Sequence, residues 1–207
     1  MHPAGAFHQT EPNPLAELIA KRGLAVIIGV DGGRAIAAHA PVLTGDGVLR
    51  FHLSAANRLI DVLERARRAL AVVTGPDAYV SPDWYAAADQ VPTWNYLSAE
   101  VEGPVRRLDR AAAARLLDDL SAHFEARLAP KPPWSRTKMT PARFETLLRA
   151  IVAYEMYIER FEGIAKLSQN KPTDEIARVA AKLAGRDDEG SRQIARLMVA
   201  PRTYPAR

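Results

Sequence analysis

Short apolar runs separated by glycine-rich turns dominate the first quarter of the chain and most constrain its fold. Asp31-Gly32-Gly33 separates the runs Leu24–Val30 and Arg34–Ala40, and Thr44-Gly45-Asp46-Gly47 precedes Val48–Leu53. Asp-Gly and Gly-Gly steps between strand-like runs are typical of β-hairpins. The pattern therefore predicts antiparallel strands here, and both glycine clusters are interpreted as turns rather than as phosphate-binding loops.

Helical patterns interrupt and follow these strands. Apolar spacing and capping signals predict helices from Asn13 to a closing Gly23, over Asn57–Arg68, over Arg110–Leu128 with Asp109 as N-cap, and over Pro141–Ile151, Asp174–Ala184 and Ser191–Ala200. Further strands are predicted at Ala69–Thr74, Thr93–Glu102, Pro104–Leu108, Ala153–Glu162 and Ile164–Leu167, with breaks at Gly103 and Gly163. This irregular alternation argues against a doubly wound sheet. It favours an α+β fold built on a β-barrel with inserted and C-terminal helices.

The composition is that of one compact domain and limits the possible chemistry. A chain of 207 residues with 48% hydrophobic and 25% charged side chains is ordinary for a globular protein. No apolar run approaches the roughly 18 residues of a membrane span, and Met1–Pro14 lacks the apolar core of a signal peptide. The absence of cysteine excludes disulfides and thiolate chemistry. We expect a cytoplasmic protein that does not bind membranes.

The net charge of +4 is concentrated at the C-terminal end. Residues 1–165 hold 19 basic and 19 acidic side chains, whereas residues 166–207 hold nine basic and five acidic ones. A local excess of this kind attracts phosphate, whether of a nucleotide or of DNA, although charged helices usually just face solvent. Direct DNA reading by the two closing helices is doubtful, because the connector Gly185–Gly190 is too long for a helix-turn-helix and carries three acidic residues.

Two aromatic motifs lie close together in the middle of the chain. They are Ser81-Pro82-Asp83-Trp84-Tyr85 and Val91-Pro92-Thr93-Trp94-Asn95-Tyr96. Aromatic rings interleaved with hydroxyl and amide groups are typical of small-molecule pockets. The same rings are equally typical of a hydrophobic core, so the residues alone leave both interpretations open.

These motifs, taken in order with three others, resemble the PaiB family of FMN-binding proteins. The other three are Phe51-His52-Leu53-Ser54-Ala55-Ala56-Asn57, Gly75-Pro76-Asp77-Ala78-Tyr79-Val80 and Lys166-Leu167-Ser168-Gln169-Asn170-Lys171. The resemblance implies a split β-barrel related to pyridoxamine-phosphate oxidases, FMN as cofactor, a homodimer, and a role as a negative regulator of transcription. We expect residues 1–171 to form the flavin-binding barrel and residues 172–207 a helical extension packed on it.

The resemblance also implies a set of FMN-binding residues. Lys166, Ser168, Gln169 and Asn170 offer an ammonium, a hydroxyl and amides, which are the groups that usually bind phosphate. The alternative interpretation of this segment is a polar turn that follows a strand and binds no ligand.

The remaining candidates lie on predicted strands and at one predicted helix start. Trp94 and Tyr96 share one face of their strand and Asn95 the other, and the sequence leaves open which face lines the flavin slot. His52 points away from the apolar face of its strand, and Asn57 begins the next helix. Both are candidates for cofactor binding.

The chain departs from the family pattern at two positions. Glu100 stands where the family usually has histidine, so a donor is replaced by an acceptor, and His2 stands in place of an N-terminal tyrosine. The first change could weaken flavin binding.

No catalytic constellation or metal motif is present in the sequence, whose five histidines are scattered. Any chemistry would belong to the flavin. Besides an FMN-binding regulator, the sequence allows a flavin-dependent oxidoreductase acting on a small substrate, or a barrel that has lost flavin affinity.

Overall fold

The computed structural model describes residues 3–9 and 11–200, which group into two compact units. The first unit combines Met1–Leu18, Thr74–Ala99 and Glu162–Arg207, and the second combines Ile19–Val73 and Glu100–Phe161. Four elements contribute residues to both units, namely helix α1 (Pro12–Arg22) and strands β5 (Arg68–Val80), β6 (Thr93–Arg107) and β8 (Arg160–Lys166). Each unit is described by itself below.

The second unit contains a closed ring of antiparallel strands. Its other strands are β2 (Leu24–Asp31), β3 (Arg34–Gly45), β4 (Val48–Ser54) and β7 (Ile151–Tyr157). Hydrogen bonding follows the order β6-β5-β2-β3-β4-β7, and pairing of β6 with β7 closes the ring. The β2–β3 hairpin pairs from Leu24 with Pro41 to Asp31 with Arg34 around the Gly32-Gly33 turn. Inside, the rings of Phe51 and Tyr154 stack with centroids 5.5 Å apart.

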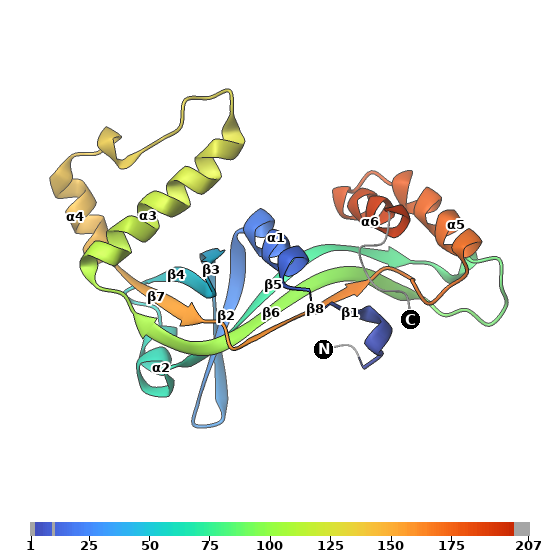
Figure 1. The fold of residues 1–207 in the computed structure, drawn as a ribbon, viewed down its shortest axis with the longest axis horizontal. Coiled ribbons are helices and arrows are strands. Elements are labelled where there is room, and N and C mark those ends of the chain that lie inside the picture. The colour runs from blue at the N-terminus through green and yellow to red at the C-terminus, as the bar shows by residue number, and fades with distance from the viewer. Residues whose placement is uncertain (1–2, 10, 201–207) are drawn as a thin grey trace. The chain divides into compact units, whose positions relative to one another are not determined.

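Helices are added to this ring between its strands. They are α2 (Leu59–Ala66), α3 (Arg110–Glu125) and α4 (Pro141–Arg149), with 3-10 turns at Ala126–Leu128 and Arg136–Lys138. Figure 1 shows α3 and α4 joined by the long connection that follows α3. A buried cluster including Leu116, Leu120 and Leu148 packs these two helices against Ala153 of β7. This packing anchors the inserted helices to the strands of the second unit.

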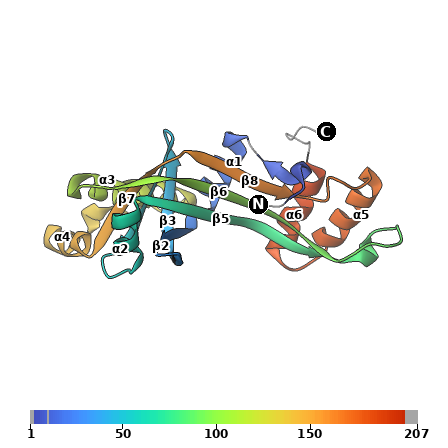
Figure 2. The same cartoon turned by 90° about the horizontal axis from the view of Figure 1, so that it is seen from below.

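The first unit is a smaller sheet covered by two helices. The elements not yet named are β1 (His8–Gln9), α5 (Thr173–Ala184), α6 (Glu189–Val199) and 3-10 turns at Gly5–Phe7 and Pro82–Trp84. Figure 2 shows α5 and α6 beside the end of β5. Leu183 and Ile194, both fully buried, share one core cluster with Val80 and Tyr85. Helices α5 and α6 thus belong to the first unit, while the division expected after residue 171 stays a prediction.

The local signals in the sequence predict much of this structure. Gly23 ends α1 at a positive φ of 64°, and its N–H donates to Ile19 O at 2.8 Å. The Asp109 carboxylate caps α3 by accepting the Ala112 N–H at 2.8 Å. The hairpins and the two closing helices also form as predicted. Among the described residues, no helix combines the length and the apolar character needed to cross a bilayer.

Two glycines predicted to break strands lie inside them instead. Strand β6 continues through Gly103, where a Cβ would come within 1.8 Å of the Tyr157 carbonyl oxygen. Strand β8 continues through Gly163, where a Cβ would come within 2.6 Å of the Ser98 carbonyl oxygen. These glycines allow close approach between backbones, and the break between β7 and β8 lies at residues 158–159.

Several predicted boundaries were also wrong by a few residues. Helix α4 ends at Arg149, so Ile151 begins a strand, and α3 gives way to a 3-10 turn after Glu125. Helix α2 is shorter than predicted at both ends, and β5 extends to Val80 rather than stopping at Thr74. Alternating burial continues along β5 through this segment, which explains the extension.

Candidate functional site

A buried hydrogen-bond cluster in the first unit joins three residues that are far apart in the sequence. The Asn95 amide Nδ2 donates to Ser168 Oγ at 3.0 Å, and the Tyr85 hydroxyl lies 3.2 Å from the same oxygen. Asn95 is completely buried, and its Nδ2 also lies 3.4 Å from Met198 Sδ of α6. Because buried polar groups are costly unless they are paired, this cluster holds the Ser168 turn against β6. The polar atoms of Asn95 and Ser168 are therefore already engaged.

The opposite face of β6 is open in the first unit. Trp94 is 53% exposed, and its ring meets that of Tyr79 edge to face with centroids 5.9 Å apart. Tyr96, on the same face by strand alternation, is half-buried. The face bearing Asn95 is closed by the cluster of α5 and α6, so the face bearing Trp94 is the one with exposed aromatic surface.

The segment after β8 forms a tight loop held by Gln169. Its side-chain oxygen accepts the Leu167 N–H at 2.7 Å, and its Nε2 donates to Ala165 O and, at 3.1 Å, to Ala6 O. Ser168 has a positive φ of 59°, which turns the chain, and Asn170 is exposed. Lys166 and Lys171 stand at the two ends of this loop.

These two lysines, Lys166 and Lys171, are half-buried. The Lys166 ammonium donates to the Thr93 hydroxyl and lies 5.9 Å from the centre of the Phe7 ring. The Lys171 ammonium donates to the Gln90 side-chain oxygen and lies 5.1 Å from the centre of the Tyr85 ring. Burial lowers the pKa of Lys166. Neither lysine forms an ion pair with a carboxylate in residues 3–9 and 11–200.

Arg160 of the second unit provides a contrast. It is half-buried too, but it lies 2.6 Å from Glu102 and 3.5 Å from Glu100. Its hydrogen bond lowers the pKa of Glu102. Glu100, which replaces the family histidine, is thus part of an ion-pair network in this structure. The other departure, His2, lies outside the described residues.

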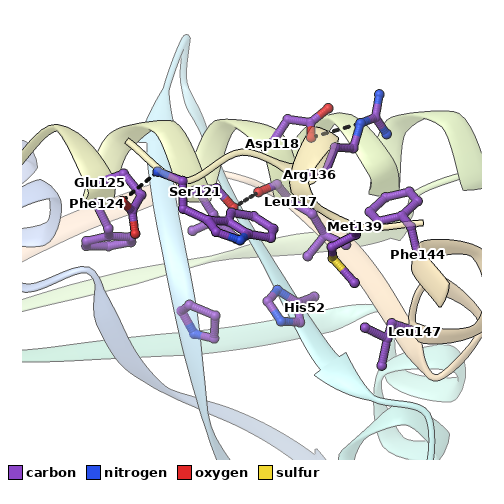
Figure 3. A pocket seen from close by; sticks show the side chains of 13 residues that line it. His52, Leu117, Asp118, Ser121, Phe124, Glu125, Arg136, Met139, Phe144 and Leu147 are labelled. Carbon is purple, nitrogen blue, oxygen red and sulfur yellow. Dashed lines mark hydrogen bonds and ion pairs between the residues drawn. The ribbon is translucent and has the colours of Figure 1, made fainter. Parts of the chain in front are cut away.

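His52 lines a pocket of about 360 Å³ in the second unit. The pocket lies between α3, α4 and the segment that joins them on one side and β3 and β4 on the other, and Figure 3 shows His52 facing this space. The buried Nδ1 atom of His52 has no hydrogen-bond partner among the described residues, and burial lowers the pKa of the imidazole.

Asn57 has a local structural role in the same unit. Its side-chain oxygen accepts the Leu59 N–H at 2.9 Å and so caps the start of α2. It also borders a shallow hollow with Arg58 and Ala35–Ala37.

The sequence predicted neither the His52 pocket nor the hydrogen bonds of Tyr85 with Ser168 and of Gln90 with Lys171. Tyr85 and Gln90 enter the first-unit contacts from the loop between β5 and β6. The only available signal was their position within or next to the aromatic motifs. Nothing in the sequence indicated that the inserted helices enclose a pocket with His52.

Comparison with known proteins identifies the family to which this chain is related. The family model described as "Putative FMN-binding domain" matches residues 1–160. Protease synthase and sporulation protein PAI 2 of Bacillus subtilis is 25% identical over 202 residues, which cover 93% of each chain.

Solved structures show the fold. The FAD and heme binding protein from Mycobacterium smegmatis aligns with a TM-score of 0.57 and 21% identity, covering 82% of this chain and 78% of that one. The flavocytochrome Anf3 from Azotobacter vinelandii aligns with a TM-score of 0.60 and 15% identity, covering 80% and 72%. Together with the closed ring of strands, these matches confirm the predicted split β-barrel.

The donor groups of the first unit fit a flavin nucleotide. Two half-buried ammonium groups without a carboxylate partner suit a phosphate, and exposed aromatic rings suit a flat ring system. Bound FMN supplies redox chemistry, while the protein positions it. The chain belongs to the FMN-binding split-barrel family that includes PaiB, and FMN is its cofactor.

Proposed function

We propose that this protein is a cytoplasmic, homodimeric FMN-binding regulator of transcription that acts through its flavin state or a partner protein, not by reading DNA itself. The observation that carries the flavin part is the pair of half-buried lysines at the ends of the Lys166–Lys171 loop, which have no carboxylate partner among the described residues. The regulatory part rests on similarity to the sporulation protein PAI 2.

Lys166 is the residue that we propose to hold the FMN phosphate most directly. A half-buried cation gains most from an anion that replaces its lost hydration. Thr93 offers a hydroxyl beside it, and Asn170 is exposed at the loop tip. Ser168, Gln169 and Asn95 would support this loop from within, because their polar atoms already bond to one another or to the backbone.

Trp94 and Tyr96 are the residues that we propose to contact the flavin ring. Their face of β6 is the one with exposed aromatic surface in the first unit. Half of the Trp94 side chain is free to pack against a cofactor or against a second copy of the chain. His52 and Asn57 belong to the second unit, and their predicted contact with flavin stays a prediction.

The closing helices offer little free positive charge for DNA. Arg192 and Arg196 of α6 lie 3.2 and 3.4 Å from Glu189. Hydrogen bonds from Ser191 lower the pKa of Asp188 to about 2, so that carboxylate stays charged and lies 3.0 Å from Arg186. Because these arginines are paired with carboxylates, few cations of the two helices remain to bind DNA phosphates and displace their counterions.

The proposal is tested on purified protein saturated with FMN. Light scattering should give a dimer of about 45 kDa, twice the chain mass of 22.7 kDa. Fluorescence anisotropy with a labelled duplex should show only weak association, on the order of 10⁻⁴–10⁻⁶ M at physiological salt, that falls steeply as salt rises. A monomer at micromolar concentration would refute the dimer. Nanomolar binding to a defined duplex, lost on removal of residues 172–207, would refute indirect action.

A further inference from the structure

The segment that joins α3 to α4 in the second unit is strongly basic. Residues 126–143, the basic connector, hold no acidic side chain and five basic ones, namely Arg127, Lys131, Arg136, Lys138 and Arg143. Apart from the half-buried Trp134 and Met139, all of its residues are exposed. A surface of one sign of charge attracts groups of the opposite sign.

Two carboxylates of α3 hold the basic connector in place. Asp118 Oδ1 lies 3.3 Å from Arg136 Nε. Glu125 Oε2 accepts the Trp134 N–H at 2.8 Å and also pairs with the Lys131 ammonium. These contacts fix the connector against α3, and they use up both carboxylates.

The other three cations of the basic connector have no carboxylate partner in the described part of the chain. Arg127 donates to the Lys21 carbonyl oxygen at 2.8 Å. A hydrogen bond from Lys131 and, further away, the charge of Lys138 lower the pKa of Glu125, but Lys138 itself forms no ion pair. Arg143 forms neither an ion pair nor a side-chain hydrogen bond among residues 3–9 and 11–200. Arg127, Lys138 and Arg143 are therefore available to external anions.

An apolar pocket of about 360 Å³ lies beside these cations. Its apolar walls include Trp134 and Met139 of the connector, Leu117 and Phe124 of α3, and Phe144 and Leu147 of α4. Figure 3 shows Met139, Phe144 and Leu147 around this space. Small-molecule sites begin at about 300 Å³, so the pocket has room for one bulky apolar side chain.

A partner that fits both features carries anions and a bulky apolar group close together. An acidic stretch of polypeptide with one aromatic or aliphatic side chain has both. A nucleic acid duplex has the anions, but its bases are stacked inside and cannot enter a pocket. The connector also offers no exposed ring on which unpaired bases could stack, because its single aromatic residue, Trp134, is half-buried in the pocket wall.

We propose that the basic connector and the adjoining pocket bind an acidic segment of a partner protein, whose carboxylates pair with Lys138 and Arg143 and whose bulky apolar side chain enters the pocket. The inference deepens the proposed function by naming the chemistry of the partner, and it rests on that function only for the regulatory role of the partner.

The probe is a synthetic octapeptide of glutamate and aspartate with one central phenylalanine, titrated into FMN-saturated protein by calorimetry. One control peptide has serine in place of phenylalanine, and another has amides in place of the carboxylates. The serine peptide should bind roughly ten- to a hundredfold more weakly, because burial of the apolar side chain is lost. The amide peptide should bind more weakly too, and its binding should lose the dependence on salt that the acidic peptide shows.

Variants of the protein separate the two features of the surface. Lys138→Glu should weaken binding of the acidic peptide about three- to tenfold, whereas Lys182→Glu, the same charge reversal at an exposed position of α5, should leave it unchanged. Leu147→Trp fills the pocket and should bind the phenylalanine and serine peptides alike. Thr146→Trp, at an exposed neighbour on α4, is its matched control.

Three results would overturn the proposal. They are no binding of the acidic peptide, equal binding of the phenylalanine and serine peptides to the unaltered protein, and unchanged binding in Lys138→Glu. Tighter binding of a DNA duplex of equal charge, also lost in Lys138→Glu, would assign the connector to nucleic acid instead. The FMN affinity and the dimer are measured on the same samples. Failure of peptide binding by an FMN-loaded dimer refutes this inference alone, whereas a monomer or a loss of FMN refutes the proposed function alone.

Discussion

The two units of this protein differ in the partners of their half-buried cations. In the first unit, the half-buried ammonium groups of Lys166 and Lys171 donate to neutral oxygens and have no carboxylate partner among the described residues. In the second unit, by contrast, the half-buried Arg160 lies beside the carboxylates of Glu100 and Glu102.

This difference separates groups that stabilise the fold from groups available to a ligand. A cation beside two carboxylates is already neutralised, whereas a cation that meets only neutral oxygens can still gain from binding an anion. Lys166 and Lys171 of the first unit are of the second kind and suit a phosphate. Arg160 of the second unit is of the first kind. We therefore expect the phosphate site of this protein in the first unit.

The largest effect is expected from cavities in the two cores. Leu183→Ala in α5 and Leu116→Ala in α3 each remove a fully or almost fully buried side chain and should lower the free energy of unfolding by about 2–5 kcal/mol. Lys182→Ala, at an exposed position next to Leu183, is the matched control.

Tryptophan fluorescence distinguishes the two units in this experiment. Trp84 and Trp94 report on the first unit and Trp134 on the second. If Leu183→Ala acted on the first unit alone, only the unfolding transition that Trp84 and Trp94 report would move to lower denaturant concentration. A loss below 1 kcal/mol for either leucine would contradict the assigned cores.

A smaller effect is expected for the buried polar cluster. Ser168→Ala leaves the Asn95 amide and the Tyr85 hydroxyl without their shared oxygen, which should cost about 1–3 kcal/mol in urea denaturation. Tyr85→Phe removes only one of the two contacts and should cost less. Equal stability of Ser168→Ala and the unaltered protein would show that this cluster does not hold the loop.

The smallest effect is expected from the titration of His52. Its folded pKa lies below its ordinary value of 6.5, because burial disfavours the charged ring. The unfolded chain therefore binds the proton more readily, so stability is complete above pH 6.5 and falls as the pH drops toward the folded pKa. Denaturation curves from roughly pH 8 to pH 5 should show a weaker decline for His52→Phe than for the unaltered protein. An identical decline would mean that other groups cause it.

Local signals in the sequence predicted local structure well. Asp109 as an N-cap, Gly23 as a helix end and the Gly32-Gly33 hairpin depend on neighbouring residues, and all three formed as predicted. Gly103 and Gly163 were misread as breaks because their roles depend on the carbonyls of Tyr157 and Ser98, which only the folded chain brings near.

The candidate site was predictable only in part, for the same reason. The resemblance to family motifs singled out the Lys166–Lys171 segment, but nothing local indicates that Ser168 would bond to Asn95, 73 positions away. The His52 pocket could not be predicted, because its walls come from strands and helices widely separated in the chain.

The central claim is that Lys166 binds the phosphate of FMN, and one measurement tests it most directly. FMN and riboflavin, which lacks the phosphate, are titrated into the unaltered protein, Lys166→Ala and the exposed control Lys182→Ala, with binding followed by flavin fluorescence. A charge-assisted hydrogen bond is worth roughly 1.5–3 kcal/mol, so Lys166→Ala should bind FMN about ten- to a hundredfold more weakly and riboflavin almost unchanged. Equal losses for both ligands, or no loss for FMN, would contradict the claim.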